Sequence, residues 1–143
     1  MPYQYLEDGV TSDVSFRVWG PDLETVFVDA GEATLRLMVD APDAVRPEIA
    51  VPIALRADAL DLLLLAFLDE LVFHKDARRL LLRAREVHVT TALRGHVLTA
   101  TLRGEAIDPT RHALATDVKA VTLHGLRVVP TATGWYAEVT LDV

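Results

Sequence analysis

Residues 58–73 read DALDLLLLAFLDELVF, a leucine-rich run without glycine or proline. Leucine and alanine favour helix, and a run of this length with no breaker residue is typical of one helix. The most apolar part, residues 62–68, is flanked by Asp61 and Asp69 and falls far short of the ~20 residues that cross a bilayer. We therefore predict a buried helix at the centre of the core, with no membrane segment.

A second amphipathic helix is predicted at residues 21–38. Apolar side chains recur there at spacings of three and four residues, from Leu23 to Met38. Asp22 and Glu24 stand where a helix N-terminus favours negative charge.

The residues before this helix predict a strand. In residues 13–19, DVSFRVW, apolar Val14, Phe16 and Val18 alternate with polar side chains, which is typical of a half-buried strand. Asp13 should therefore face away from the core.

The rest of the chain predicts mostly strands. They are expected at residues 48–55, 80–93, 97–103, 117–122, 126–129 and 135–141, with a turn at 94–96 and a long loop at 104–116. Two helices followed by a run of strands indicate an α+β fold. We predict a single domain over residues 1–143, with two main helices packed on mainly antiparallel β-sheets.

The composition excludes several classes of function. The chain has 143 residues, of which 21 are Asp or Glu and 14 are Lys or Arg, and its formal net charge is −7. This charge disfavours stable, direct nucleic-acid binding. There is no cysteine, which excludes disulfides, thiolate zinc sites and cysteine nucleophiles. Acidic residues near the N-terminus do not fit a secretory signal, so a cytoplasmic protein is expected.

No enzyme motif stands out. The glycines form neither a dinucleotide-binding pattern nor a P-loop, and no serine lies in a nucleophile elbow. None of the five histidines forms the helical pair of a metalloprotease zinc site. A small hydrolase that uses a metal-bound water is disfavoured because no positioned base accompanies the candidate acids.

Three oxygen-bearing groups lie near strand ends. Asp13 starts the first long predicted strand, Asp142 ends the last, and Val143 follows with a terminal carboxylate. If these strands are neighbours, the carboxylates converge and would repel one another without a cation, and oxygen ligands favour Ca²⁺ or Mg²⁺. The alternative is that both aspartates are ordinary solvated acids.

Three further polar residues are candidates for a functional surface. Lys119 is expected near the start of a strand, either as a solvated lysine or as a ligand for a phosphate or a partner's carboxylate. His112 and His124 flank it, and they either belong to the same surface or form hydrogen bonds within loops.

The order of several motifs resembles the archease family over essentially the whole chain. These motifs are Thr11-Ser12-Asp13-Val14, Phe16, Trp19-Gly20, Gly104-Glu105, Asp108-Pro109, Arg111-His112, Val118-Lys119-Ala120-Val121-Thr122, His124-Gly125-Leu126, Trp135 and Leu141-Asp142-Val143. One departure is that many archeases have a histidine shortly before the Thr-x-Asp segment, whereas this chain has Asp8 and no histidine there. Asp8 is therefore a further candidate ligand.

The resemblance implies a function and a site. Archeases are non-enzymatic accessory proteins that assist an RtcB-type RNA ligase in tRNA splicing and RNA repair, promoting its guanylylation and multiple turnover. By this resemblance Asp13, Asp142 and Val143 would bind a divalent metal, usually calcium, with Mg²⁺ or Mn²⁺ as alternatives, and Lys119 would be a functional neighbour. The alternative function is a general metal-dependent protein chaperone or calcium-binding module.

Overall fold

The computed structural model describes residues 2–6 and 12–143. Its elements follow in the order β1 (Tyr3–Leu6), β2 (Asp13–Gly20), α1 (Leu23–Met38), a 3₁₀ turn (Pro42–Ala44), β3 (Ile49–Ala57), α2 (Leu60–Arg78), β4 (Leu80–Arg83), β5 (Val87–Ala92), β6 (Gly95–Ala106), β7 (Ala120–Val121), β8 (Arg127–Pro130) and β9 (Trp135–Asp142). The described helices include none long and apolar enough to cross a membrane.

The strands form two separate sheets. One has the order β1-β2-β9-β7, and β8 pairs with β9 further along the same edge. The other has the order β3-β6-β4, with β5 also paired to β6. Every paired strand is antiparallel, which confirms the predicted α+β class with mainly antiparallel sheets.

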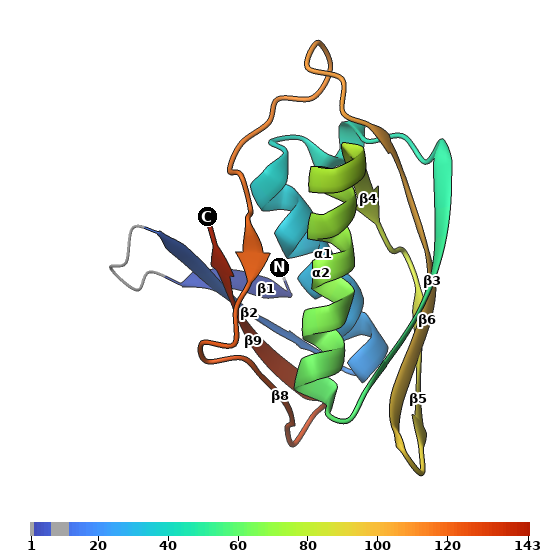
Figure 1. The fold of residues 1–143 in the computed structure, drawn as a ribbon. Coiled ribbons are helices and arrows are strands. Elements are labelled where there is room, and N and C mark those ends of the chain that lie inside the picture. The colour runs from blue at the N-terminus through green and yellow to red at the C-terminus, as the bar shows by residue number, and fades with distance from the viewer. Residues whose placement is uncertain (1, 7–11) are drawn as a thin grey trace.

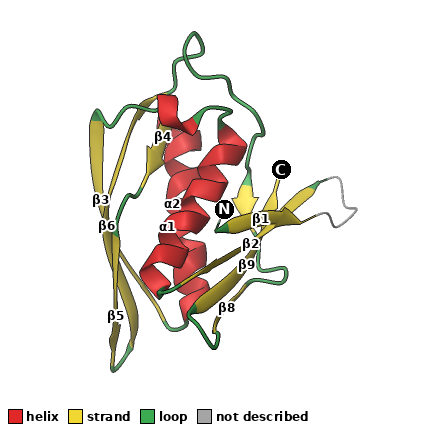
Figure 2. Cartoon of the chain, turned by 180° about the vertical axis from the view of Figure 1, so that it is seen from behind, coloured by secondary structure: helices red, strands yellow, loops and turns green. Residues whose placement is uncertain are grey.

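The two helices lie between the two sheets, as the opposite views in Figures 1 and 2 show. Phe27 of α1 and Phe67 of α2 have ring centroids 6.1 Å apart, and both side chains are fully buried. Gly31 lets the helices approach closely, since a Cβ there would lie 3.3 Å from the Phe67 ring. The predicted central position of the leucine-rich helix is confirmed, because most of its apolar side chains, though not Leu62 and Phe73, join a core that both sheets share.

The predicted strand over residues 80–93 is divided in two by a bulge. Arg83 pairs with Arg103 and Val87 pairs with Ala100, so four steps along this strand match three along β6. The extra residue interrupts the ladder at residues 84–86, which is the defining feature of a β-bulge. The interruption contains Arg85 and Glu86, both charged and exposed, and strand pairing resumes at Val87.

Other boundaries also differ from prediction. Helix α2 continues to Arg78, and its end is marked by Arg79 in the left-handed region at φ 53°. Strand β6 continues to Ala106 where a loop was predicted, because its last residues pair with β4. Strand β1 was not predicted; it pairs with β2, and its Tyr5 hydroxyl donates to the Ala33 carbonyl at 2.8 Å.

Candidate metal site and its supporting contacts

The first candidate site lies where β2 begins and β9 ends. Asp13 and Asp142 are direct partners in the antiparallel register. Directly opposed side chains share one face of a sheet, with Cβ atoms roughly 5 Å apart. The next pair, Val14 and Leu141, has the opposite orientation, and Leu141 is fully buried in the core. The two half-buried aspartates therefore lie side by side on the outer face, so the condition for their convergence, that the two strands are neighbours, is met.

Backbone hydrogen bonds hold this strand end on both sides. The Val143 N–H donates to the Ser12 carbonyl at 2.9 Å, and the Lys119 N–H donates to the Asp142 carbonyl at 2.8 Å. Ala120 of β7 is the register partner of Asp142 on the side away from β2. Asp142 thus lies on the middle strand of three paired strands. This pairing holds its backbone on both sides and so fixes the point from which its side chain extends.

The Asp13–Asp142 pair concentrates negative charge. The neighbouring pair on the outer face is neutral, with the Ser15 and Thr140 hydroxyl oxygens 2.7 Å apart, and the pair after it joins Arg17 with Glu138. Within residues 2–6 and 12–143, neither aspartate forms an ion pair with a basic side chain. Like charges directly opposed across strands are destabilising, and a bound cation would offset this repulsion.

The donor set fits a hard divalent cation. Carboxylate and backbone oxygens are the ligands that Ca²⁺ and Mg²⁺ prefer, and zinc sites usually have nitrogen or sulfur ligands. In the part of the chain that the structure describes, no third His, Asp or Glu side chain completes a cluster here. Further oxygens would have to come from Val143, which follows Asp142 directly, or from backbone carbonyls.

Lys75 of α2 anchors the segment that leads to β7. Its ammonium group donates to the Asp117 carboxylate at 2.7 Å and to the Val118 carbonyl at 2.6 Å, and the side chain is almost fully buried. The hydrogen bond and charge of Lys75, with a smaller effect of Lys119, hold the pKa of Asp117 below its ordinary value. The strand predicted at residues 117–122 is shorter in the structure, Ala120–Val121, and the two residues at its predicted start contact Lys75 instead.

Lys119, His124 and Asp8 were the other candidates for the functional surface. Lys119 lies just before β7, not within a strand; its N–H donates to the Asp142 carbonyl, and its side chain is exposed and helps to lower the pKa of Asp117. His124 is exposed in a turn, where its N–H donates to the Thr122 hydroxyl at 3.2 Å. Asp8 lies outside the described residues. Lys119 and His124 are therefore accessible to a partner.

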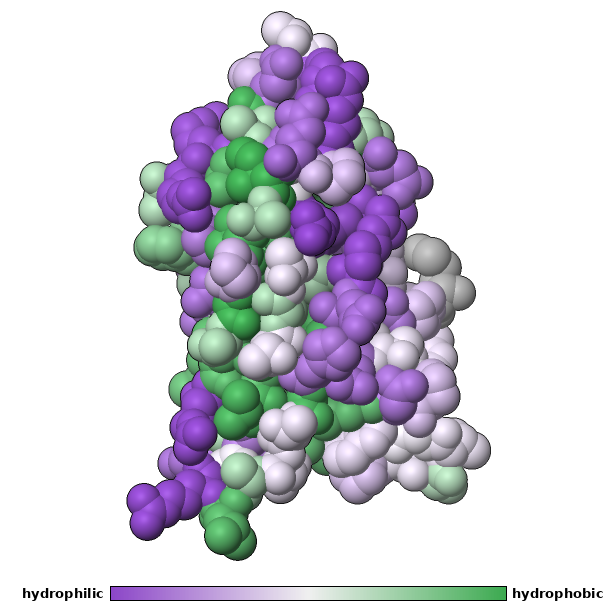
Figure 3. All heavy atoms as spheres, turned by 90° about the vertical axis from the view of Figure 1, so that its right-hand side faces the viewer, coloured by the Kyte–Doolittle hydropathy of each residue, from purple (hydrophilic) through white to green (hydrophobic). Residues whose placement is uncertain are grey.

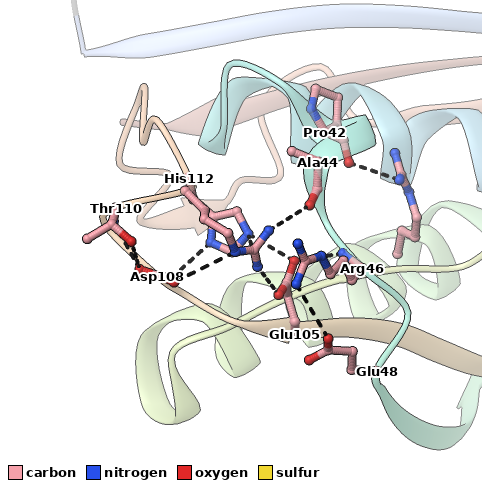
Figure 4. A network of polar contacts seen from close by, with 10 residues as sticks. Pro42, Ala44, Arg46, Glu48, Glu105, Asp108, Thr110 and His112 are labelled. Carbon is pink, nitrogen blue, oxygen red and sulfur yellow. Dashed lines mark hydrogen bonds and ion pairs between the residues drawn. The ribbon is translucent and has the colours of Figure 1, made fainter.

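His112, in contrast, belongs to a buried polar network around Glu105 (Figure 4). The Glu105 carboxylate accepts the Arg46 N–H at 2.7 Å, contacts the His112 Nε2 at 3.0 Å and forms an ion pair with Arg111. These contacts, chiefly the Arg46 hydrogen bond, hold the pKa of Glu105 below its ordinary value. The network joins the end of β6 to the loops on either side of it.

The hydrogen bonds of His112 indicate which of its ring nitrogens carries the proton. The Asp108 N–H donates to Nδ1 at 2.9 Å, so Nδ1 is an acceptor and the proton is on Nε2, which donates to Glu105. With 2% of its surface exposed, the side chain has no access to a partner. The option that His112 faces a partner is therefore wrong, and the alternative of a hydrogen-bonding loop residue agrees with the structure.

Replacing Glu105 with glutamine is expected to lower Tm by at least about 3 °C near pH 7, because the amide brings a donor among groups that already donate. Since folding lowers the pKa of Glu105, its contribution to stability is present above the ordinary glutamate pKa and is lost as pH falls through the folded value. The difference in Tm between wild type and variant should therefore shrink when the pH is lowered from neutral to a value below the ordinary glutamate pKa. Thermal unfolding followed by circular dichroism at both pH values measures it, and a difference that does not change with pH would refute this account.

Sequence reasoning missed two supporting residues. Lys75 was missed because a lysine near a helix end normally reaches solvent, and its burial depends on a segment 42 positions away. Glu105 appeared only within a motif, and no role was assigned to it. The signal was present in its spacing to Asp108, Arg111 and His112, all of which contact or surround it.

Comparisons with known proteins agree with this architecture. Residues 3–143 match the model of the Archease protein family (MTH1598/TM1083). The protein named Protein archease from Methanopyrus kandleri is 36% identical over 143 residues, with all of both chains covered. Its namesake from Pyrococcus abyssi is 29% identical over 134 residues, which cover 93% of this chain and 94% of that one.

Solved structures extend the comparison. The solution structure of Methanobacterium thermoautotrophicum protein 1598 is 30% identical, with a TM-score of 0.83 and 99% of each chain covered. The crystal structure of an archease, described as a possible chaperone, from Thermotoga maritima has a TM-score of 0.62 over 98% of this chain and 99% of that one. At 10% identity it shows a shared fold alone. The match over residues 3–143 confirms the resemblance seen in the sequence motifs, and the chain belongs to the archease family.

Proposed function

We propose that this protein is a non-catalytic accessory factor that activates an RtcB-type RNA ligase, promoting its guanylylation and multiple turnover in tRNA splicing and RNA repair. The activator would hold a divalent cation, Ca²⁺ in preference to Mg²⁺ or Mn²⁺, through Asp13, Asp142 and oxygens of Val143. The observation that carries this proposal is the direct opposition of Asp13 and Asp142 on the outer face of the sheet, at one end of β2 and β9. We place its action in the cytoplasm, where its ligase would work.

Residues of this chain would have separate roles at the site. The β2–β9 ladder fixes the spacing of the two aspartates, and the Lys75 anchor fixes the segment that carries Lys119. When bound, the cation supplies positive charge that balances both carboxylates and attracts oxygen groups of a partner. Lys119 and His124, both exposed, would contact that partner, and Lys119 suits a phosphate or a carboxylate.

The test is multiple-turnover joining of RNA ends by the cognate ligase, with the ligase limiting, in the presence of wild type or of Asp142→Ala. Wild type should restore repeated turnover and Asp142→Ala should not, because the variant lacks half of the carboxylate pair. Glu138→Gln is the matched control, since Glu138 lies on the same face of β9, pairs with Arg127 at 3.4 Å and is remote from the pair.

The outcomes separate the candidate functions. Stimulation by wild type and Glu138→Gln but not by Asp142→Ala supports the metal-dependent activator. No stimulation by wild type excludes the activator and favours a general metal-dependent chaperone or calcium-binding module. Suppression of the aggregation of an unrelated unfolded protein would then support the chaperone.

A further inference from the structure

A polar hollow lies on the sheet formed by β3, β4, β5 and β6. It occupies about 540 Å³ on the outer face of β3, β5 and β6, at the bulge between β4 and β5. Its polar lining consists of Arg85, Glu86, His88, Thr99, Thr101 and Arg103. Figure 3 views this side of the molecule, where strongly hydrophilic residues flank a band of pale and green ones. The aspartate pair belongs to the opposite sheet, so the hollow is separate from the proposed metal site.

The bulge forms part of the hollow and contributes the positively charged side chain of Arg85 to it. Residues 84–86 have no partner in the β6 register, which places exposed Arg85 over the strand. Arg103 comes from β6 itself, opposite Arg83. Arg83 is buried and its guanidinium is held by Glu32 at 2.7 Å, but the Arg103 side chain is exposed. Two arginines therefore converge on the hollow from neighbouring segments.

The charges of these arginines are not balanced locally. Neither Arg85 nor Arg103 forms an ion pair with any residue that the structure describes. The nearest acid in the lining, Glu86, contacts His88 at 2.8 Å, and His88 also lies 4.0 Å from Glu24. Within the lining itself, two arginines accompany one acid, so its formal charge is +1 with a neutral histidine, on a protein whose net charge is −7.

The chemistry of the lining matches a phosphate group. Guanidinium groups bind phosphate oxygens through two parallel hydrogen bonds, and threonine hydroxyls can donate further ones. The exposed Thr99 and Thr101 lie on one face of β6 with Arg103, since alternate residues of a strand share a face. Ligand pockets typically measure about 300–1,000 Å³, so this volume suits a ligand the size of a nucleotide. We propose that the hollow binds the phosphate of a nucleotide-sized ligand.

The test is a titration of the full-length, ¹⁵N-labelled protein with adenosine monophosphate, followed by amide chemical shifts. A second arm uses inorganic phosphate, and all samples have the same ionic strength, set with sodium chloride. Saturable shifts are expected at the amides of Thr99, Thr101 and Arg103. Arg103→Gln should weaken binding at least about fivefold, because one of the two guanidinium groups is lost. Arg85→Gln should have a similar effect and serves as a second variant, since Arg85 lies outside the regular strands.

Arg56→Gln is the matched control. Arg56 is an exposed arginine on β3, opposite Val97, and it does not line the hollow. The proposal is supported if Arg56→Gln changes affinity less than about twofold while both hollow variants reach the fivefold loss. If inorganic phosphate binds as tightly as adenosine monophosphate, the phosphate group alone accounts for the affinity. If adenosine monophosphate binds more tightly, the rest of the nucleotide also contacts the hollow. The proposal is overturned if the shifts do not saturate, or if Arg56→Gln weakens binding as much as Arg103→Gln.

Discussion

Replacing Asp142 with asparagine is expected to weaken Ca²⁺ binding at least tenfold, about 1.4 kcal/mol of binding free energy. The substitution keeps the shape of the side chain and removes one of the two charges that face each other across β2 and β9. Asp13→Asn should have a similar effect, and the double variant should bind no Ca²⁺. Isothermal titration calorimetry after treatment with a chelator measures these affinities.

Thermal unfolding of the same variants tests the sign of the electrostatic argument. Without Ca²⁺, Asp142→Asn should be at least as stable as wild type, because it removes a like-charge repulsion across the strands. Adding Ca²⁺ should raise the Tm of wild type, because an ion that binds the folded state stabilises it. The Tm of the variant should not change, because the variant binds Ca²⁺ too weakly. Glu138→Gln should respond to Ca²⁺ as wild type does. An equal response of Asp142→Asn would show that the aspartate pair is not the metal site.

Replacing Gly104 with alanine is expected to cost more than about 3 kcal/mol of unfolding free energy, enough to leave a large unfolded fraction. A Cβ at this position would lie 1.7 Å from the Leu81 carbonyl oxygen of the paired strand β4. The obstacle is backbone, so no side-chain rotation relieves it. The clash would also disturb Glu105, the next residue, and thereby its buried network. Urea denaturation measures the loss.

Gly20→Ala is the control for this experiment. A Cβ at Gly20 would meet its nearest atom, a Thr25 methyl group, at 3.5 Å, which is an ordinary van der Waals contact. Both variants add one methyl group to a strand glycine, and they differ in what that methyl group meets. Gly104→Ala with a stability near that of Gly20→Ala would show that β4 can move away from β6 at little cost.

Much of the fold was predictable from local patterns. The leucine-rich run predicted α2, the three- and four-residue spacing predicted α1, and the alternation in residues 13–19 and 135–141 predicted β2 and β9. These patterns are reliable because each segment repeats its apolar residues with the period of its own backbone. The ordered motifs also predicted the archease family, which the comparisons confirm.

Features that depend on contacts between distant segments were not predictable in the same way. The burial of Lys75, the bulge before β5 and the extension of β6 to Ala106 depend on partners far along the chain. His112 was ambiguous for the same reason, because the Asp108 N–H and Glu105 that determine its tautomer become neighbours of its ring only after folding. A polar residue in a sequence does not show whether it will find a buried partner or water.

Patterns along the chain were enough to assign the two helices, the main strands, the family and the candidate acids Asp13 and Asp142. That these two aspartates are direct partners on one face became known from the folded chain, since it depends on strand order and register. The folded chain also shows that Arg85 and Arg103 line the same hollow. The physical reason is that backbone periodicity is a local property, whereas the proximity of charges arises from packing between segments that the sequence separates.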